Sequence, residues 1–274
     1  MTEIELKDIK KITDVINSRY GIDFGNYALS SFKRRIKRIM DLQNIKSVDS
    51  IINNLETSTL YFKEFLSEIT VNVTEMFRDP TFWLALRDDI LIPLLNNRDE
   101  IRIWHAGCSS GEEVYSMAIL LNVIGKQNKV TIYASDIDEK IINKAKNKTY
   151  SNKNMELNAS NFNEIYPDDN LLNYFQEKDE KFTLKEEFTQ NITFKKHNLV
   201  SDDAFSKFDI ILCRNVLIYF NQQLQNNVLK KLTSGLFKGG VLCIGSKESL
   251  IWCEDINQYQ EINREEKIFR KIQD

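Results

Sequence analysis

The stretch Ile101-Arg-Ile-Trp-His-Ala-Gly-Cys-Ser-Ser-Gly-Glu-Glu113 decides the fold. Its first six residues form an apolar run, which predicts a strand buried on both faces of a sheet. Gly107 and Gly111 then allow a tight turn and a close approach to a ligand, because they carry no side chain. A helix follows, and its first N–H groups have no partner within the helix. A strand, a glycine turn and a helix in this order predict a nucleotide-like cofactor at the carboxyl end of a parallel sheet.

Two acidic residues at the start of that helix, Glu112 and Glu113, restrict the cofactor that the turn could hold. They would repel a pyrophosphate and attract a cation. This favours S-adenosylmethionine, whose sulfonium is positive, over NAD or ATP. A Rossmann dehydrogenase is the weaker alternative, because the turn lacks the G-x-G-x-x-G arrangement.

The composition of the 274-residue chain is that of an ordinary soluble protein, with 42% hydrophobic and 28% charged residues. A formal net charge of −3 does not predict a nucleic-acid partner, and no apolar run has the length of a membrane span. The N-terminus lacks the apolar centre of a signal peptide, so we expect a cytoplasmic protein that does not insert into a membrane. Four scattered cysteines and two histidines predict reduced thiols and no metal site.

Three regions are predicted along the chain. Residues 1–70 carry apolar residues at helical spacing and predict an N-terminal all-helical domain. Residues 71–90 predict a linker that contributes to the cofactor site. Residues 91–274 alternate strands with helices, which predicts right-handed βαβ units, an α/β class and a doubly wound, mostly parallel sheet. The strands are expected at residues 101–106, 130–134, 192–196, 208–213 and 241–244.

An insertion interrupts this alternation at about residues 155–190. It is polar with short apolar pieces, and we expect a small antiparallel β-subdomain there, either a hairpin or three strands. Further along the chain, Gly239-Gly240 predicts a turn before the last strand.

The segment Asn72-Val-Thr-Glu-Met-Phe-Arg-Asp-Pro80 lies between the helical region and the first strand of the sheet. It interleaves hydrogen-bonding side chains with apolar ones, more than a plain linker needs. We therefore expect Asn72, Thr74 and Arg78 to face a site. A second interpretation is a capped helix start, with Asp79 as the N-cap and proline in the first helical position, and both can hold together.

Polar residues also follow two other predicted strands. Asp136 ends the strand after the glycine turn, at a distance that suits a ribose, whose hydroxyls a carboxylate can bind. Its alternative role is to cap the next helix. Arg214 and Asn215 follow residues 208–213, at the sheet edge where ligands bind in open α/β folds. Tyr219, a few residues later, could reach the same cleft or pack in the core.

Arg34, Arg35 and Arg38 form a basic face with two neighbouring lysines on one predicted helix. A basic run of this kind is either a solvated helix face or a surface that docks an acidic partner.

Together these motifs resemble the CheR-type chemotaxis receptor glutamate O-methyltransferases. The resemblance rests on residues 72–80, 107–113, 134–138, 213–220 and 239–240, which occur in the same order and spacing. It implies a Rossmann-like methyltransferase sheet, an N-terminal helical domain and a small inserted antiparallel β-subdomain. It also implies S-adenosylmethionine-dependent methylation of glutamate side chains on bacterial chemoreceptors. The products would be glutamate methyl esters and S-adenosylhomocysteine, made during chemotaxis adaptation.

The resemblance also implies residue roles, matched motif by motif. Arg78 and Tyr219 resemble the pair beside the transferred methyl group. Arg34, Arg35 and Arg38 resemble the surface that docks on the cytoplasmic helical bundle of the receptor. We further expect a monomer that needs no metal. The implied cofactor contacts are Asn72, Thr74, Arg78, Gly107, Glu113, Asp136, Asn198, Leu199, Arg214 and Asn215.

The chain departs from the family pattern in three places. Val114 follows the paired glutamates where proline is usual, and Ser246-Lys247-Glu248 replaces a more typical His-Ser-Glu. The insertion between Phe175 and Ile192 is short, as in members that do not need a receptor tail peptide. Two other functions stay open: a non-catalytic receptor adaptor that binds S-adenosylmethionine, and a methyltransferase for another protein or a small molecule.

Overall fold

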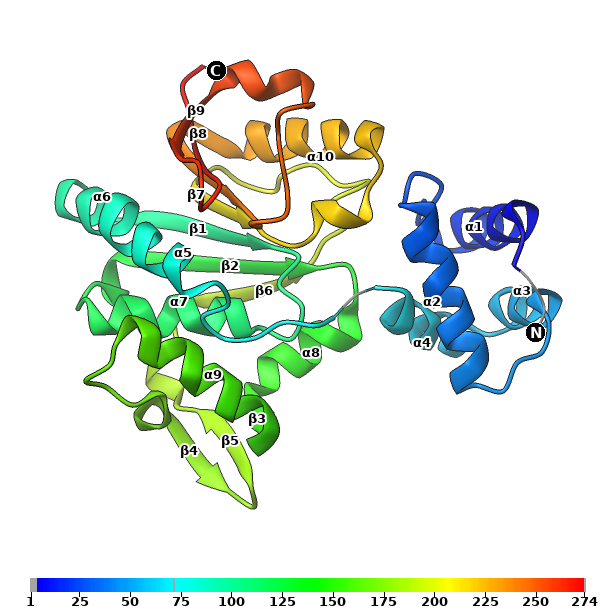
Figure 1. The fold of residues 1–274 in the computed structure, drawn as a ribbon, viewed down its shortest axis with the longest axis horizontal. Coiled ribbons are helices and arrows are strands. Elements are labelled where there is room, and N and C mark those ends of the chain that lie inside the picture. Colours follow the sequence, from blue (N-terminus) through cyan, green and yellow to red (C-terminus); the bar gives the residue numbers. More distant parts are fainter. Residues whose placement is uncertain (1–3, 71, 274) are drawn as a thin grey trace.

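The computed structural model of the protein describes residues 4–70 and 72–273 (Figure 1). An all-helical part lies to one side of a larger part that is built around a sheet. The helical part contains α1 (Leu6–Tyr20), α2 (Leu29–Leu42), α3 (Val48–Thr57) and α4 (Thr59–Ile69). The predicted domain boundary falls at Val71, which lies outside the described residues, as do the first three residues of the predicted helical domain. Within the described ranges, no helix is both long enough and apolar enough to cross a membrane.

The four N-terminal helices surround an apolar core of their own. Ile12, Ile36 and Phe65 are fully buried there, each on the inward face of its helix. The side chains of Ser47 and Ser58 accept hydrogen bonds from the backbone N–H three residues later, at 3.2 and 3.1 Å. These caps fix the starts of α3 and α4, because they satisfy N–H groups that a helix leaves unpaired.

The larger part contains a seven-stranded sheet in the order β6-β2-β1-β7-β8-β10-β9. Its strands are β1 (Ile101–Ala106), β2 (Val130–Asp136), β6 (Ile192–Lys196), β7 (Phe208–Cys213), β8 (Leu236–Ile244), β9 (Tyr259–Asn263) and β10 (Ile268–Lys271). The first five are parallel, whereas β10 runs antiparallel to both of its neighbours. The predicted doubly wound, mostly parallel sheet is therefore confirmed.

Helices cover both faces of this sheet (Figure 1). They are α5 (Pro80–Ala85), α6 (Ile92–Asn97), α7 (Glu112–Val123), α8 (Glu139–Asn147), α9 (Asn152–Ile165) and α10 (Gln222–Gly235), with a π-helical stretch over Leu86–Leu91 between α5 and α6. Successive residues of β1 pack into the cores on opposite faces of the sheet, because side chains alternate along a strand. Ile103 packs in a core with residues of α5 and α7, and Trp104 packs in a core with residues of α10.

The glycine pair near the C-terminus was predicted as a turn, and this was wrong. Gly239 and Gly240 lie inside β8, where the register with β7 shifts before Ile210. Gly239 has a φ of +81°, and a Cβ on Gly240 would lie 2.8 Å from the carbonyl oxygen of Phe237. The pair therefore forms an irregularity in a strand, which is the other common use of glycine in a sheet.

The predicted small antiparallel sheet is present, in the order β3-β5-β4, but β3 lies before the predicted start of the insertion at about residue 155. Its strands are β3 (Thr149–Ser151), β4 (Phe175–Lys178) and β5 (Lys181–Leu184). The sequence did not predict α9, which lies between β3 and β4. Its inward face includes two buried asparagines, Asn158 and Asn161, which bond to the backbone of Met76 in the linker at 2.9 and 3.0 Å. These amides interrupt the apolar stripe of Met155, Phe162 and Ile165, by which the helix could have been predicted.

Candidate functional site

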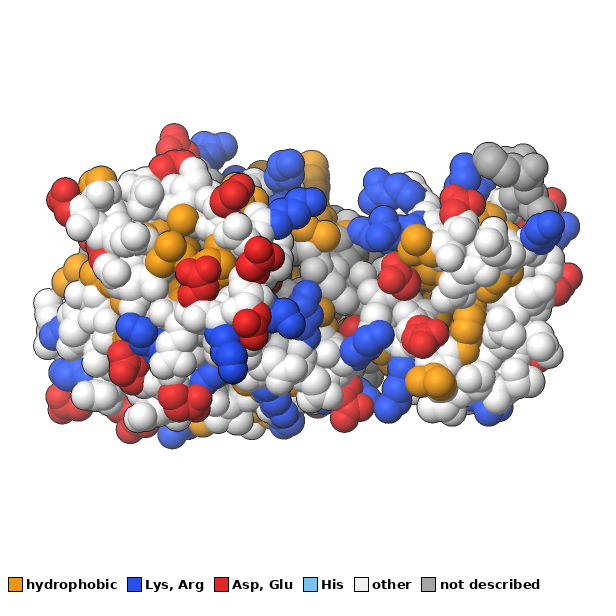
Figure 2. Space-filling model, turned by 90° about the horizontal axis from the view of Figure 1, so that it is seen from below, with side chains coloured by type: hydrophobic (Ala, Val, Ile, Leu, Met, Phe, Trp, Pro, Cys, Tyr) orange, Lys and Arg blue, Asp and Glu red, His pale blue; other side chains and the backbone are white. Residues whose placement is uncertain are grey.

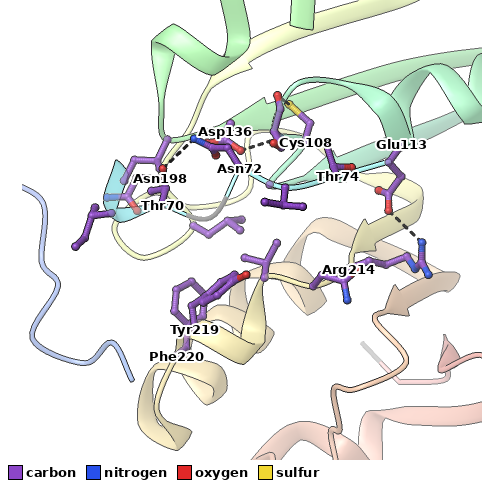
Figure 3. Close-up of a pocket in the computed structure, with 18 of the residues that line it drawn as sticks. Thr70, Asn72, Thr74, Cys108, Glu113, Asp136, Asn198, Arg214, Tyr219 and Phe220 are labelled. Atoms are coloured by element: carbon purple, nitrogen blue, oxygen red, sulfur yellow. Dashed lines mark hydrogen bonds and ion pairs between the residues drawn. The ribbon is translucent and has the colours of Figure 1, made fainter. Parts of the chain in front are cut away.

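A cleft lies at the carboxyl ends of β1, β2 and β7, where the strand order of the sheet reverses. It holds about 1150 Å³ of space between protein atoms, part of it open to solvent. Figure 3 shows Asp136 and Glu113 on one wall and Arg214 and Tyr219 on the opposite wall. The cleft is lined by all residues predicted as cofactor contacts or as the pair beside the methyl group: Asn72, Thr74, Arg78, Gly107, Glu113, Asp136, Asn198, Leu199, Arg214, Asn215 and Tyr219.

The glycine turn after β1 brings the backbone to the edge of the cleft. Gly107 has a φ of +83°, and a Cβ there would lie 2.6 Å from Cγ2 of Val216. The backbone N–H of Gly107 donates to the carbonyl oxygen of Ser135 at 2.8 Å, which ties the turn to β2. Glycine is required at this position, because a side chain would meet both a strained backbone and an occupied space.

Asp136 is held at the end of β2 by backbone donors. Its Oδ2 accepts a hydrogen bond from the N–H of Ser109 at 2.9 Å, and its Oδ1 accepts one from the N–H of Asp138 at 3.0 Å. Burial raises the pKa of Asp136, although these bonds oppose the rise. A carboxylate accepts about four hydrogen bonds, so Asp136 retains capacity for a ligand.

The two acids after the glycine turn face different ways. Both carboxylate oxygens of Glu112 accept from the hydroxyl of Ser110, at 2.9 and 2.7 Å, and Glu112 is buried away from the cleft. Glu113 lines the cleft, with Oε1 at 2.9 Å from Nδ1 of His105. The prediction that both acids select a positive ligand is therefore wrong for Glu112. It holds as a prediction for Glu113 alone.

Arg214 joins the two walls of the cleft. Its side chain is 2% exposed, and its guanidinium lies 2.7 Å from Oδ2 of Asp79 and 3.4 Å from Oε2 of Glu113. It also lies over the ring of Phe82, at 3.8 Å from the centroid. Burial alone would raise the pKa of Glu113, but the hydrogen bond and attraction to His105 and Arg214 bring that pKa below its ordinary value.

The structure confirms that Asp79 and Pro80 open a helix, but the side chain of Asp79 does not cap it. The backbone of Asp79 is left-handed, with a φ of +55°, and its carboxylate turns to Arg214 instead. An ion pair with a buried guanidinium therefore replaces the expected cap.

Arg78 sits between two residues with left-handed backbones, Phe77 at φ +52° and Asp79 at φ +55°. Phe77 is fully buried, and its N–H donates to the hydroxyl of Ser116 at 2.8 Å. The indole N–H of Trp83 donates to the carbonyl oxygen of Arg78 at 3.1 Å. Non-glycine residues in such conformations cost about 1–3 kcal/mol each and occur where the surroundings impose them. The linker is thus held firmly where Arg78 meets the cleft.

Tyr219 lies in a short 3₁₀ turn (Leu217–Tyr219) after β7 and is half-buried. Its carbonyl oxygen accepts from the N–H of Ala28 at 2.8 Å, so the helical part contacts this loop directly. Burial raises the pKa of Tyr219, while the charges of Arg35 and Arg78 act in the opposite direction. The hydroxyl is therefore protonated at neutral pH and can donate a hydrogen bond.

The three arginines of the predicted docking surface lie on α2 and do not line the cleft. Arg34 and Arg38 are exposed, and Arg38 lies 3.5 Å from Glu68. Arg35 is half-buried near Tyr219, and burial lowers its pKa.

Sequence reasoning missed the contribution of the helical part to the cleft, whose lining includes Tyr27, Ser31 and Phe32. No local pattern marks these residues, because they come from a part of the chain far from the strand ends that form the rest of the cleft. Tyr27 forms a β-bridge with Phe220 in that loop. Ile137 also lines the cleft, and its place directly after a strand-end acid could have revealed it.

The cleft suits a polar ligand the size of a nucleoside. Three polar atoms on its lining residues are buried without a hydrogen-bond partner: Oγ of Ser109, Nδ1 of His197 and Nε of Arg214. Buried polar atoms without partners are rare, and a polar ligand in the cleft can supply what they lack. In the described ranges, no group of three His, Cys, Asp or Glu side chains could hold a metal ion.

The glycine turn after β1, the acid at the end of β2 and the antiparallel last strand define an S-adenosylmethionine-dependent methyltransferase. The chain belongs to the CheR methyltransferase family. Residues 72–268 match the family's SAM binding domain, and residues 7–70 match its all-alpha domain. The family resemblance and the cofactor predicted from the sequence are thereby confirmed.

Several curated relatives match nearly end to end. The Cher3 protein of Pseudomonas putida is 35% identical, over 98% of this chain and 97% of its own. The chemotaxis protein methyltransferases of Borreliella burgdorferi and Listeria monocytogenes are 34% and 31% identical, each over 89% of this chain and over 88% and 91% of their own lengths. Among solved structures, magnesium protoporphyrin IX methyltransferase from Synechocystis with bound SAH is 14% identical. The match covers 86% of this chain and 70% of that protein, with a TM-score of 0.35.

Proposed function

We propose that this methyltransferase transfers the methyl group of S-adenosylmethionine to glutamate side chains of chemoreceptors. The observation that carries the proposal is the placement of Arg78 and Tyr219 in one cleft, beside the helical part that bears the basic α2. The names of the Listeria and Borreliella relatives support a role in chemotaxis. The products are a glutamate methyl ester and S-adenosylhomocysteine.

Methyl transfer to a carboxylate demands little acid–base chemistry. A glutamate side chain, with a pKa of about 4.3, is already ionised at neutral pH, so no general base is needed. The cofactor supplies an electrophilic methyl group on a positive sulfur, which leaves as a neutral thioether. A carboxylate oxygen bonds to the methyl carbon as the carbon–sulfur bond breaks, and no proton moves. The protein must therefore bring the two reactants together and remove water from the carboxylate.

The cleft can perform both tasks. Arg78 donates hydrogen bonds to the incoming carboxylate, and the protonated hydroxyl of Tyr219 donates another or shapes the pocket. Arg78 must not grip the carboxylate too tightly, because stabilising the ground state would raise the barrier. In this proposal Asp136 binds the ribose hydroxyls and Glu113 contacts the adenosyl part. The rest of the cofactor pocket is formed by Asn72, Thr74, Gly107, Asn198, Leu199, Arg214 and Asn215.

The substrate approaches over a basic surface in this proposal. Arg34 and Arg38 are exposed on α2, and Figure 2 shows Lys and Arg side chains on both sides of the furrow between the two parts of the molecule. Such a surface attracts an acidic helical bundle and orients it before docking. Because receptors present their methylated bundle in the cytoplasm, the proposal places the reaction there.

The test is incubation with radiolabelled cofactor and receptor-containing membranes, followed by alkaline hydrolysis. Carboxyl methyl esters release their label in base, whereas methylated nitrogen does not. Arg78→Ala should lose about 10²-fold or more in turnover, because the carboxylate would no longer be held in line with the methyl group and small misplacements of reactants cost that much. Arg264→Ala is the matched control, because Arg264 is exposed and lies outside the cleft. Base-stable label would refute glutamate as the acceptor, and wild-type turnover by Arg78→Ala would remove Arg78 from the mechanism. Absence of any methyl transfer would favour the receptor adaptor.

A further inference from the structure

A buried acid lies behind the loop that carries Tyr219. Glu248 is 5% exposed, although it follows an exposed serine and lysine after β8. Its carboxylate accepts from three backbone N–H groups: Asn215 at 3.0 Å, Gly245 at 2.5 Å and Ile218 at 3.2 Å. Burial raises the pKa of Glu248, and these backbone bonds oppose the rise. A buried carboxylate is costly unless it is hydrogen-bonded, so such an arrangement indicates a specific task.

The three donors bring together two loops of the sheet edge. Asn215 and Ile218 belong to the loop after β7, and Gly245 is the first residue after β8. Tyr219 directly follows Ile218, and its own backbone N–H donates to the carbonyl oxygen of Val216 at 3.2 Å. Glu248 therefore fixes the start and the middle of the short segment that ends in Tyr219.

The loop after β7 cannot relax easily at this contact. Asn215 has a left-handed backbone, with a φ of +60°, and lines the cleft. A Cβ on Gly245 would lie 2.9 Å from the backbone nitrogen of Asn215 and 2.9 Å from Oε2 of Glu248. The close approach therefore requires glycine at this position, and a strained residue is held beside the cleft by the carboxylate.

The same loop is held on its other side by the helical part. The carbonyl oxygen of Tyr219 accepts from Ala28, and the N–H of Asn221 donates to the carbonyl oxygen of Asn26 at 2.9 Å. Gln225 holds the loop as well, because its side-chain Nε2 donates to the carbonyl oxygens of Leu217 at 3.0 Å and Phe220 at 3.1 Å. Glu248 instead holds the backbone N–H groups that precede Tyr219.

We propose that Glu248 is a positioning residue for methyl transfer, which holds the loop of residues 214–219 so that the Tyr219 hydroxyl meets the substrate carboxylate. The inference rests on the proposed role of Tyr219. Glu248 does not line the cleft, so it acts through the loop and not on the reactants.

The test is a double-mutant cycle between Glu248→Gln and Tyr219→Phe, measured as kcat for methyl transfer to receptor membranes. Glutamine has nearly the shape of glutamate, but its NH₂ group cannot accept from a backbone N–H. Glu248→Gln should lower kcat by about tenfold and change the affinity for S-adenosylhomocysteine by less than about threefold. Residues that act as a unit are not additive, so Tyr219→Phe should cost little more in the Glu248→Gln background.

A matched control is Glu254→Gln, because Glu254 is an exposed acid that pairs with Lys230 at 2.8 Å. It should leave kcat unchanged. Should Glu248→Gln fail to fold by circular dichroism, Gly245→Ala displaces the same contact while keeping the carboxylate, and the same lack of additivity is expected. The inference would be overturned by a wild-type kcat in the Glu248 variant. It would also be overturned if the fold-loss of kcat in the double variant equalled the product of the two single losses. Wild-type kcat in Tyr219→Phe would instead refute the role of Tyr219 in the proposed function, and the inference with it.

Discussion

Removal of the Arg214 guanidinium tests whether the buried ion pairs hold the cleft together. Arg214→Met keeps a long apolar stem over Phe82 but leaves Asp79 and Glu113 without their shared cation. The side chain of Arg214 is 2% exposed and that of Glu113 is 19% exposed, whereas that of Asp79 is 32% exposed, so water can replace part of what Asp79 loses. Loss of one partner from a buried ion pair costs about 3–5 kcal/mol. We expect a decrease near the lower end of that range in the free energy of unfolding at pH 8.

The loss should depend on pH with a defined sign. In the native protein the pKa of Glu113 lies below its ordinary value, so its contribution is present above the unfolded pKa and disappears as the pH falls through the folded pKa. Removal of Arg214 removes one of the charges that lower the pKa of Glu113, whereas the burial that raises this pKa remains. The variant therefore binds a proton at a higher pH than the native protein does. Its deficit should shrink as the pH falls toward 5, because a neutral Glu113 needs no cation.

The assay is urea unfolding at pH 8 and pH 5, followed by tryptophan fluorescence. Trp83 and Trp104 are fully buried in the larger part of the molecule, so their emission reports on its core. The unfolding curves from fluorescence and from circular dichroism must first coincide, which shows that the transition is two-state. Arg214→Lys is the control, since it keeps the charge without the planar fork that reaches both carboxylates. An equal deficit at both pH values, or one below about 1 kcal/mol at pH 8, would refute the reasoning.

Three further predictions concern other parts of the molecule. Gly107→Ala should destabilise the protein by about 2 kcal/mol, because the added Cβ would lie 2.6 Å from Cγ2 of Val216 and φ is +83°. Thermal unfolding measures this, and an unchanged midpoint would contradict it. Asp136→Asn should weaken binding of S-adenosylhomocysteine by about tenfold or more in calorimetry, because hydrogen bonds to a charged acceptor are the stronger ones; equal affinity would exclude Asp136 from the ribose site. Ser58→Ala should cost about 1 kcal/mol, the usual value of an N-cap, and a larger loss would show that Ser58 does more than cap α4.

The sequence predicted most of the sheet because its strands are apolar runs that end in glycine or in polar residues. The stretch from residue 101 to residue 113 predicted β1, the glycine turn and α7, and the structure places all three as expected. The sequence did not predict β9 and β10, which are short and partly polar, and two further features escaped prediction for a physical reason. The inward face of α9 buries asparagines, and Gly239 and Gly240 are strand residues with turn-like chemistry. Local pattern does not distinguish these cases, because their partners lie far away in the chain.

The candidate site shows the same division. Asp136, Arg214 and Asn215 could be placed from sequence because strand ends meet at one edge of a parallel sheet. The opposite orientations of Glu112 and Glu113 could not be predicted, because each side chain is oriented by its partners. Glu112 bonds to Ser110, whereas Glu113 bonds to His105 and Arg214.

The sequence by itself determined the class of fold and the family, because periodicity and motif spacing are local properties. Only the tertiary structure decided which side chains meet in the cleft. Tyr27 reaches it from the helical part, and Glu248 reaches the Tyr219 loop from behind β8. Such contacts join residues far apart in the chain, and their energies depend on burial and geometry that no local pattern contains.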